Sequence, residues 1–217
     1  MSEAMLLSYD PVKGLLPQPT SHAAPATISL APPLLDSGST LAAALSKRQS
    51  VREFAPTPLS LQQLSELLWA ANGINRPETG GRTAPSAHGL NEIDLYVALP
   101  EGVYQYEPVA HRLRLKRAVD ARNLTGYQDF VGRAPLDLVY VVNHARADQM
   151  PEAVRGTFSG VAAGAISQNV SLYCAATRLG CVVRGWLNQR LLAEALSLNE
   201  DEVPVLAQTV GHPTAEQ

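Results

Sequence analysis

The 217-residue sequence predicts one domain that mixes helices and strands, with strands paired out of sequence order. Three observations lead to this fold class. Apolar residues alternate with a period of two in some segments and recur at helical spacing in others. The predicted strands are separated by helices and by a hairpin, without repeated βα units. The GxGxxG turn of a dinucleotide-binding fold does not occur in the sequence.

Helices are predicted where apolar residues return to one face and a breaking residue follows. Residues 40–47 read as a short helix, and the proline-bearing segment 56–58 keeps it from continuing. Ser60 and Gln63 form a capping-box pattern that begins a second, amphipathic helix. Gly73 is expected to end this helix in a left-handed conformation.

The longest predicted helix runs from Ser159 to Leu179 and is expected to stop at Gly180. Its first turns are rich in glycine and alanine, which let another backbone approach closely. Gln168 and Asn169 lie in its middle, and polar amides there need partners if they are buried. Two interpretations follow: a central helix covered on all sides, packed on its own copy in a dimer, or an ordinary buried helix in a monomer.

Strands are predicted where apolar residues alternate, or run on continuously, between turn residues. Residues 136–142 are nearly all apolar, so we expect this strand to be buried on both faces. Tyr104 and Tyr106 of the hairpin would either line a pocket with Tyr127 or pack within the sheet. A last helix follows the cap residue Asn188. The predicted strands and hairpin arms are 93–99, 102–106, 112–115, 136–142, 181–185 and 204–210.

The remaining segments lack clear periodicity. Residues 1–27 are expected to form an N-terminal arm, and residues 28–33 read as extended. Residues 75–91 form a long loop rich in glycine, proline and serine, which is either a binding loop or a plain surface connection. Residues 117–130 are expected to be partly helical, with Gly126 as a break.

Composition argues against several functions. The net charge of −3 gives no electrostatic reason to expect a nucleic acid or an acidic membrane as partner. Cys174 and Cys181 lie in apolar segments without metal-ligand spacing, so we expect buried free thiols and no metal site. The N-terminus lacks a signal-peptide pattern, and no apolar run reaches the roughly 18 residues of a membrane helix. We therefore expect a soluble, cytoplasmic protein.

One segment carries paired cationic side chains. Arg48 and Arg52 are four residues apart, with the hydroxyl of Ser50 midway between them. Arginine offers forked, permanently charged donors that match the oxygens of a phosphate. The same spacing also occurs on solvated surfaces, so by itself it indicates either a phosphate site or a plain surface segment.

Four segments, taken in order, resemble those of the nitroreductase-like flavoproteins, and most of all those of SagB-type dehydrogenases. Each segment is modest alone, but the ordered set is specific, and the resemblance covers about residues 28–213. The segments are residues 48–54 (RQSVREF), residues 83–87 (TAPSA), the helix from Gly164 through Gln168 and Asn169 to Gly180, and residues 210–213 (VGHP).

This resemblance implies an α+β fold with a central, mostly antiparallel sheet flanked by helices. It further implies that residues 28–217 form an interlocked homodimer with FMN bound between the subunits and NAD(P)H as the electron donor. The implied function is an FMN-dependent oxidoreductase that transfers hydride by a ping-pong route through flavin N5 to a nitroaromatic, a quinone or a specific metabolite. No protein nucleophile or general base is required for that chemistry.

The resemblance also implies which residues bind the cofactor. Those at the phosphate and the ribityl chain are Arg48, Gln49, Ser50 and Arg52. Those beside the isoalloxazine ring, supplied by the other subunit, are Pro85, Ser86, Ala87 and Asn91. Arg184 and Gly185 would lie near the N5 and O4 edge of the ring, where a backbone N–H tunes hydride acceptance. His88 is a further candidate for touching substrate or flavin.

Two features depart from the family pattern. Relatives place another basic residue shortly after the final glycine, but here only His212 follows Gly211, so the phosphate would depend on the paired arginines or borrow a cation such as Arg184. Relatives that oxidise azoline rings in peptides are longer and act with partner proteins, so that substrate is not assigned. Two alternatives stay open: a non-catalytic flavin-binding or redox-sensing protein, and a SagB-type partner in a peptide-modifying complex.

Overall fold

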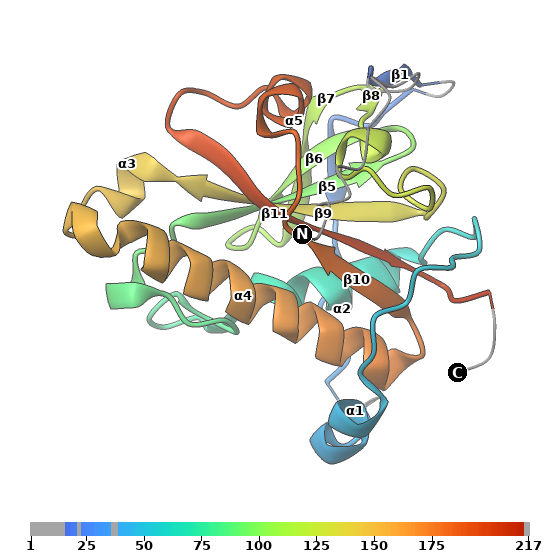
Figure 1. The fold of residues 1–217 in the computed structure, drawn as a ribbon. Coiled ribbons are helices and arrows are strands. Elements are labelled where there is room, and N and C mark those ends of the chain that lie inside the picture. Colours follow the sequence, from blue (N-terminus) through green and yellow to red (C-terminus); the bar gives the residue numbers. More distant parts are fainter. Residues whose placement is uncertain (1–15, 21–22, 36–38, 215–217) are drawn as a thin grey trace, which may run out of the picture.

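A seven-stranded sheet forms the centre of the fold, and each of its strands runs antiparallel to its neighbours. The computed structural model describes residues 16–20, 23–35 and 39–214. Within these residues the strand order is β10-β11-β9-β5-β6-β7-β2 (Figure 1). The strands are β2 (Thr27–Ser29), β5 (Ile93–Leu99), β6 (Gly102–Glu107), β7 (Arg112–Arg117), β9 (Leu136–Asn143), β10 (Gly180–Arg184) and β11 (Glu202–Gly211).

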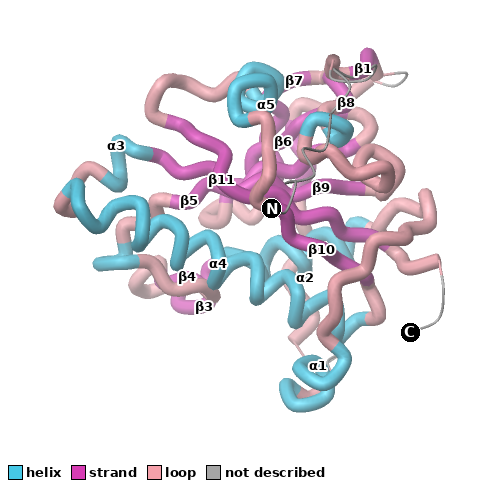
Figure 2. The backbone as a smooth tube through the Cα atoms, in the orientation of Figure 1, coloured by secondary structure: helices cyan, strands magenta, loops and turns pink. Residues whose placement is uncertain are grey.

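Helices cover both faces of this sheet. Figure 2 shows α1, α2 and α4 on one side and α5 on the other. The α-helices among the described residues are α1 (Leu41–Lys47), α2 (Leu61–Asn72), α3 (His144–Ala147), α4 (Glu152–Thr177) and α5 (Gln189–Leu196). The predicted α+β class, with a mostly antiparallel sheet flanked by helices, is confirmed.

The central strand β9 shows why the sheet needs two helical layers. Leu138 and Tyr140 belong to the core that includes α2 and α4, whereas Val139 and Val141 pack with α5. Successive side chains of a strand point to opposite faces, so a nearly continuous apolar run buries both. The predicted burial of residues 136–142 on both faces is confirmed.

Helix α2 begins as predicted but ends differently. The Ser60 hydroxyl accepts the N–H of Gln63 at 3.1 Å, and the Gln63 side chain accepts the N–H of Ser60 at 2.9 Å, which completes the capping box. Gly73 has φ −75° and ψ 167°, so the predicted left-handed stop is wrong. Glycine is needed there for space, because a Cβ would lie 2.5 Å from Cδ1 of Trp69.

Helix α4 differs from the prediction at both ends. It begins at Glu152 rather than Ser159, because its exposed first turns carry little apolar periodicity for a sequence pattern to detect. It ends at Thr177, and Arg178, at φ 61°, takes the left-handed position expected of Gly180. Gly180 is instead the first residue of β10.

The chain's own elements leave one side of α4 uncovered. Phe158, Val161 and Gln168 are exposed, so the interpretation of an ordinary buried helix in a monomer is wrong, and coverage on all sides would require a second copy. Asn169 is half-buried, and its side chain donates to the carbonyl of Ala71 at 3.5 Å. Because Gln168 is exposed, its side-chain amide needs no hydrogen-bond partner within the chain.

Two connections contain more structure than predicted. The loop expected at 75–91 includes a small hairpin of β3 (Ile74–Arg76) and β4 (Gly81–Arg82), followed by a 3-10 turn. The segment 117–130 holds β8 (Val119–Asp120), which pairs with β1 (Gln18–Pro19), and its helical part is only a 3-10 turn at Arg122–Leu124. That turn is fixed by Asp120, whose carboxylate accepts both the backbone and the side-chain N–H of Arg122.

The N-terminal part of the chain is described in pieces. Of the arm expected over residues 1–27, residues 1–15 and 21–22 lie outside the described residues. Residues 27–29 are extended and pair with β7 at the edge of the sheet. Cys174 and Cys181 are buried and unbridged, as predicted. Within the described part, every helix is too short or too polar to span a membrane.

Candidate functional site

The cationic segment is held against one end of the sheet by backbone hydrogen bonds. The N–H of Val51 donates to the carbonyl of Cys181 at 2.9 Å, and the N–H of Ala55 donates to the carbonyl of His212 at 2.8 Å. Residues 48–54 therefore lie beside both the start of β10 and the segment that follows β11. Three segments that are distant in sequence meet at this place.

Side chains of this extended segment divide into buried anchors and exposed polar groups. Val51 and Phe54 are buried in a small core with Ala134 and Val182. Their burial leaves the intervening polar side chains facing outward. In the described part of the chain, neither arginine of the segment forms an ion pair with a carboxylate. The exposed polar residues are Arg48, Gln49, Ser50, Arg52 and Glu53.

Two glycines allow the close approach of these segments. A Cβ on Gly180 would lie 2.8 Å from Cγ1 of Val51, and a Cβ on Gly211 would lie 2.7 Å from Cδ of Pro135. Side chains at these positions would push the cationic segment or the end of β11 away. Gly180, which the sequence analysis assigned to a helix stop, therefore allows the cationic segment to pack against the start of β10.

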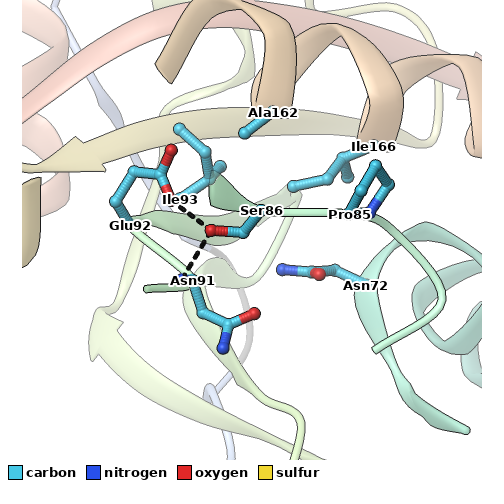
Figure 3. A pocket seen from close by; sticks show the side chains of 8 residues that line it. All are labelled: Asn72, Pro85, Ser86, Asn91, Glu92, Ile93, Ala162 and Ile166. Carbon is cyan, nitrogen blue, oxygen red and sulfur yellow. Dashed lines mark hydrogen bonds between the residues drawn. The ribbon is translucent and has the colours of Figure 1, made fainter. Parts of the chain in front are cut away.

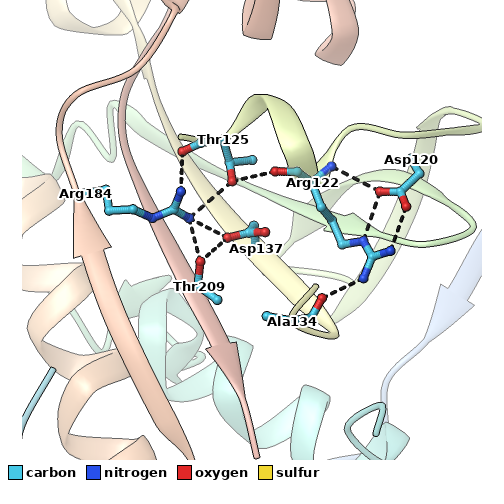
Figure 4. Close-up of polar contacts among 7 residues, drawn as sticks. All are labelled: Asp120, Arg122, Thr125, Ala134, Asp137, Arg184 and Thr209. Carbon is cyan, nitrogen blue, oxygen red and sulfur yellow. Dashed lines mark hydrogen bonds and ion pairs between the residues drawn. The ribbon is translucent and has the colours of Figure 1, made fainter. Parts of the chain in front are cut away.

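Arg184 is placed differently from the other predicted cationic residues. Its guanidinium is buried and donates to Asp137 at 2.5 Å, to the carbonyl of Thr125 at 2.7 Å and to the hydroxyl of Thr209 at 2.6 Å (Figure 4). A guanidinium held in this way cannot be lent to a phosphate, so that part of the expectation is corrected. Gly185, which follows it, is exposed.

Burial shifts the pKa values of both members of this ion pair. It raises the pKa of Asp137, and the positive charge of Arg184 opposes the rise. Burial also lowers the pKa of Arg184, which the Asp137 charge opposes. At the other end of β10, hydrogen bonding with Cys174 lowers the pKa of Cys181 to about 7, although burial opposes this.

The second predicted part of the site is the loop that contains Ser86. The Ser86 hydroxyl donates to Glu92 at 2.6 Å and accepts the backbone N–H of Asn91 at 2.8 Å (Figure 3). Asn91 and His88 both have positive φ, at 51° and 52°. A small pocket opens beside these groups. Its lining residues are Asn72, Pro85, Ser86, Asn91, Glu92, Ile93, Ala162 and Ile166.

The two parts of the predicted site are separate in one subunit. The Ser86 pocket touches Ala162 and Ile166 near the middle of α4, whereas Ser50 pairs with Cys181 beyond the end of that helix. From Ile166 to Thr177 an α-helix rises about 17 Å. In Figure 1 residues 48–54 run past the C-terminal end of α4, on the side of the molecule opposite to α3.

The remaining candidates lie in the β6–β7 hairpin and in the Ser86 loop. Tyr104 and Tyr106 are buried in the main core, so the interpretation of hairpin packing holds for both. His88 is exposed at the tip of its loop, and Ala87 is half-buried against the core.

Three polar residues near the site were not predicted from the sequence. Asn72 and Glu92 are buried beside the Ser86 pocket, and Oε1 of Glu92 has no hydrogen-bond partner among the described residues. Asp137 is the third. The sequence does mark it, because it is the only charged residue in the apolar run 136–142. A lone carboxylate in a doubly buried strand requires a partner. For Asn72 and Glu92 the sequence alone offers no comparable signal.

Comparison with known proteins agrees with this geometry. Residues 45–212 match the nitroreductase family. A nitroreductase-family protein of Methanocaldococcus jannaschii is 32% identical over 77% of this chain and 88% of its own length. The crystal structure of a Ralstonia eutropha JMP134 nitroreductase homologue is 58% identical, covers 97% of this chain and 100% of its own, and superposes with a TM-score of 0.91.

A more distant structure shares the fold. The NADPH:FMN oxidoreductase of Vibrio harveyi, solved with NAD+, is 20% identical over 81% of this chain and 69% of its own, with a TM-score of 0.61. At this identity the likeness concerns the fold alone. The family match spans the cationic segment, the Ser86 loop, α4 and the end of β11. The chain therefore belongs to the nitroreductase family.

Proposed function

We propose that the protein is an FMN-dependent oxidoreductase whose homodimer binds the cofactor between subunits. The observation that carries this proposal is the separation of the two site parts along α4. Each subunit presents a cationic segment at one place and the Ser86 loop at another. A second copy could bring its own Ser86 loop to the first copy's cationic segment, as the family resemblance implies.

The exposed face of α4 supports a dimer of this kind. Phe158 is 42% and Val161 61% exposed, although both are large apolar side chains. A Cβ on Gly156, Gly160 or Gly164 would meet nothing within 4 Å. A helix face with small residues flanked by apolar ones lets a second backbone pack closely and buries apolar area.

The residues of the cationic segment fit the phosphate of FMN. Arg48 and Arg52 offer two permanently charged donor groups, neither of which forms an ion pair with a carboxylate in the described part of the chain, and Ser50 is exposed between them. When bound, FMN supplies hydride transfer between a reduced nicotinamide and an acceptor. Gly185 and the Ser86 loop would orient the ring and limit access of water to it.

The reaction class follows from this cofactor and from the family. We propose NAD(P)H as donor and a nitroaromatic, a quinone or a specific metabolite as acceptor, with the two half-reactions in turn. The name of the Vibrio harveyi enzyme supports this pairing of NADPH with FMN on the same fold. The motifs favour the SagB-type branch. Steady-state turnover of NADH or NADPH would distinguish an enzyme from a flavin-binding sensor.

The first test measures flavin content and the contribution of Arg48. Purified wild-type protein should be a yellow dimer with one FMN per subunit. Arg48→Ala should lose bound FMN, because a charged donor to the phosphate is removed. Arg190→Ala is the matched control, since Arg190 is exposed on α5 across the sheet. Equal flavin content in both variants would contradict the phosphate assignment.

The second test asks whether one site uses two subunits. Arg48→Ala and Ser86→Trp chains, each unable to bind FMN alone, are unfolded, mixed in equal amounts and refolded. Mixed dimers would contain one intact site, so about a quarter of all sites should bind FMN. A site built within one chain would give no recovery, and that result would overturn the shared-site proposal.

A further inference from the structure

We propose that the buried pair of Asp137 and Arg184 positions the end of β10 and sets the reduction potential of the bound flavin. This inference rests on the proposed function, which places Arg184 and Gly185 at the N5 and O4 edge of the ring. Asp137 acts through Arg184 and is therefore a positioning residue.

The guanidinium of Arg184 crosses one strand to reach its partner. Its Nη2 donates to Asp137 on β9 and to Thr209 on β11, the strand that lies between them. Thr209 also donates its hydroxyl to Asp137, and the Arg184 Nη1 donates to the carbonyl of Thr125 (Figure 4). The side chains of Arg184 and Asp137 are 4% and 0% exposed. One side chain thus ties β10 to two other strands and a loop.

The guanidinium packs closely against its neighbours. A Cβ on Gly126 would lie 2.1 Å from Nη1 of Arg184, so any side chain there would displace the guanidinium from its present position. The centroid of the Phe130 ring lies 5.7 Å from the guanidinium carbon. These contacts and the hydrogen bonds together hold the side chain of Arg184.

This anchoring matters most at the edge of the sheet. Strand β10 is the edge strand of the sheet next to β11, Ser50 bridges it at Cys181 near its start, and Arg184 is its last residue. Beyond it Gly185 and Trp186 are exposed. The hydrogen bonds of the Arg184 side chain thus hold the strand end at the point where the chain leaves the sheet. In the proposed holoprotein this point faces the reacting edge of the flavin.

The two charges of the pair lie close together. The Arg184 guanidinium reaches from β10 across β11 to within 2.5 Å of Asp137 on β9. Each charge therefore offsets most of the field of the other while the pair is intact. Buried charges are weakly screened, and reduction adds negative charge to the flavin ring. Removal of either charge alone should therefore change the reduction potential, in opposite directions for the two residues.

A contribution to stability alone does not explain why this ion pair is buried. Two buried charges lose their hydration, and apolar replacements of buried ion pairs are often no less stable. Oδ2 of Asp137 and Nε of Arg184 have no hydrogen-bond partner among the described residues. The neighbouring pair of Asp120 and Arg122 is more exposed, at 20% and 13%, and its guanidinium also binds the Ala134 carbonyl. That second pair supplies a control.

The test measures the midpoint potential of the FMN-loaded protein by spectroelectrochemistry. Asp137→Asn keeps the side-chain shape but leaves the Arg184 charge unbalanced, so the potential should rise. We expect at least a tenfold change in the ratio of reduced to oxidised flavin at fixed potential, which is about 30 mV for two electrons. Arg184→Gln removes the positive charge and leaves the Asp137 charge unbalanced, so the potential should fall.

Two further variants separate charge from structure. The double variant Asp137→Asn/Arg184→Gln carries no unbalanced buried charge, so its potential should return toward that of the wild type. Asp120→Asn removes a carboxylate from the more exposed pair and should leave the potential unchanged. If Asp137→Asn does not fold, the proposal is still tested, because Arg184→Gln should lower the potential whereas the double variant should stay near the wild-type value.

The outcomes distinguish this inference from the proposed function. Wild-type protein that binds no FMN would overturn the proposed function itself. Variants that bind FMN with the wild-type potential would overturn only the role of the Asp137 and Arg184 pair. An equal shift in Asp120→Asn would also overturn it, because the effect would then be general to carboxylates in this region.

Discussion

Two sets of arginines lie at opposite ends of β10, and their surroundings differ completely. Beside the start of the strand, Arg48 and Arg52 are exposed and have no carboxylate partner in the described part of the chain. At its end, Arg184 is buried and bound to Asp137 and two threonines. The first set can receive a ligand, whereas the second holds the protein itself. Residue type alone does not reveal which role an arginine has.

The largest expected difference between the two sets is in stability. Arg184→Ala should lower the free energy of unfolding by about 3–5 kcal/mol, because it leaves the buried Asp137 without its partner. Arg52→Ala should change it by less than about 0.5 kcal/mol, as is usual for an exposed side chain. Urea denaturation of both variants measures this. A small effect at Arg184 would mean that the pair is not held as the structure shows.

A conservative substitution sharpens the same contrast. Arg184→Lys should cost about 1.5–3 kcal/mol of unfolding free energy, since one ammonium cannot reproduce the forked hydrogen bonds to Asp137, Thr125 and Thr209. Arg52→Lys should leave stability unchanged and should weaken FMN binding only modestly. Denaturation together with a flavin titration tests both expectations. Equal losses of stability at the two positions would break the comparison.

The packing of the cationic segment against Gly180 can be tested without altering the arginines themselves. Gly180→Ala places a methyl group within 2.8 Å of Val51, so the cationic segment or β10 must shift. We expect a loss of about 1–3 kcal/mol in stability from this overpacking, together with weaker FMN binding. Thermal denaturation and flavin titration measure the two effects. Unchanged FMN affinity in a destabilised variant would show that the contact between Gly180 and Val51 does not position the phosphate site.

The smallest expected effect is the coupling between the two sets. Arg52 and Arg184 share no hydrogen-bond partner among the described residues. The stability changes of Arg52→Ala and Arg184→Lys should therefore add to within about 0.5 kcal/mol in the double variant. A double-mutant cycle from urea denaturation checks this. A larger coupling energy would mean that the two ends of β10 act as one unit.

Periodicity in the sequence predicted the elements whose patterns are local. The apolar run of β9 and the capping box of α2 depend on neighbouring residues, and both are confirmed. The start of α4 escaped prediction because its first turns are exposed and lack an apolar stripe. Gly73 and Gly180 were assigned to helix ends, but contacts with Trp69 and Val51 explain them. Such contacts cannot be read from local propensity.

By itself, the sequence determined the α+β class, the buried strands, the unbridged cysteines and the motifs of the nitroreductase family. These features follow from residue type and spacing along a short stretch of chain. Only the tertiary structure decided that Arg184 is buried while Arg48 and Arg52 are exposed. Arg184 finds Asp137 47 residues away in sequence, across an intervening strand. Burial depends on which distant segments pack together, and that packing separates an exposed cation from a structural one.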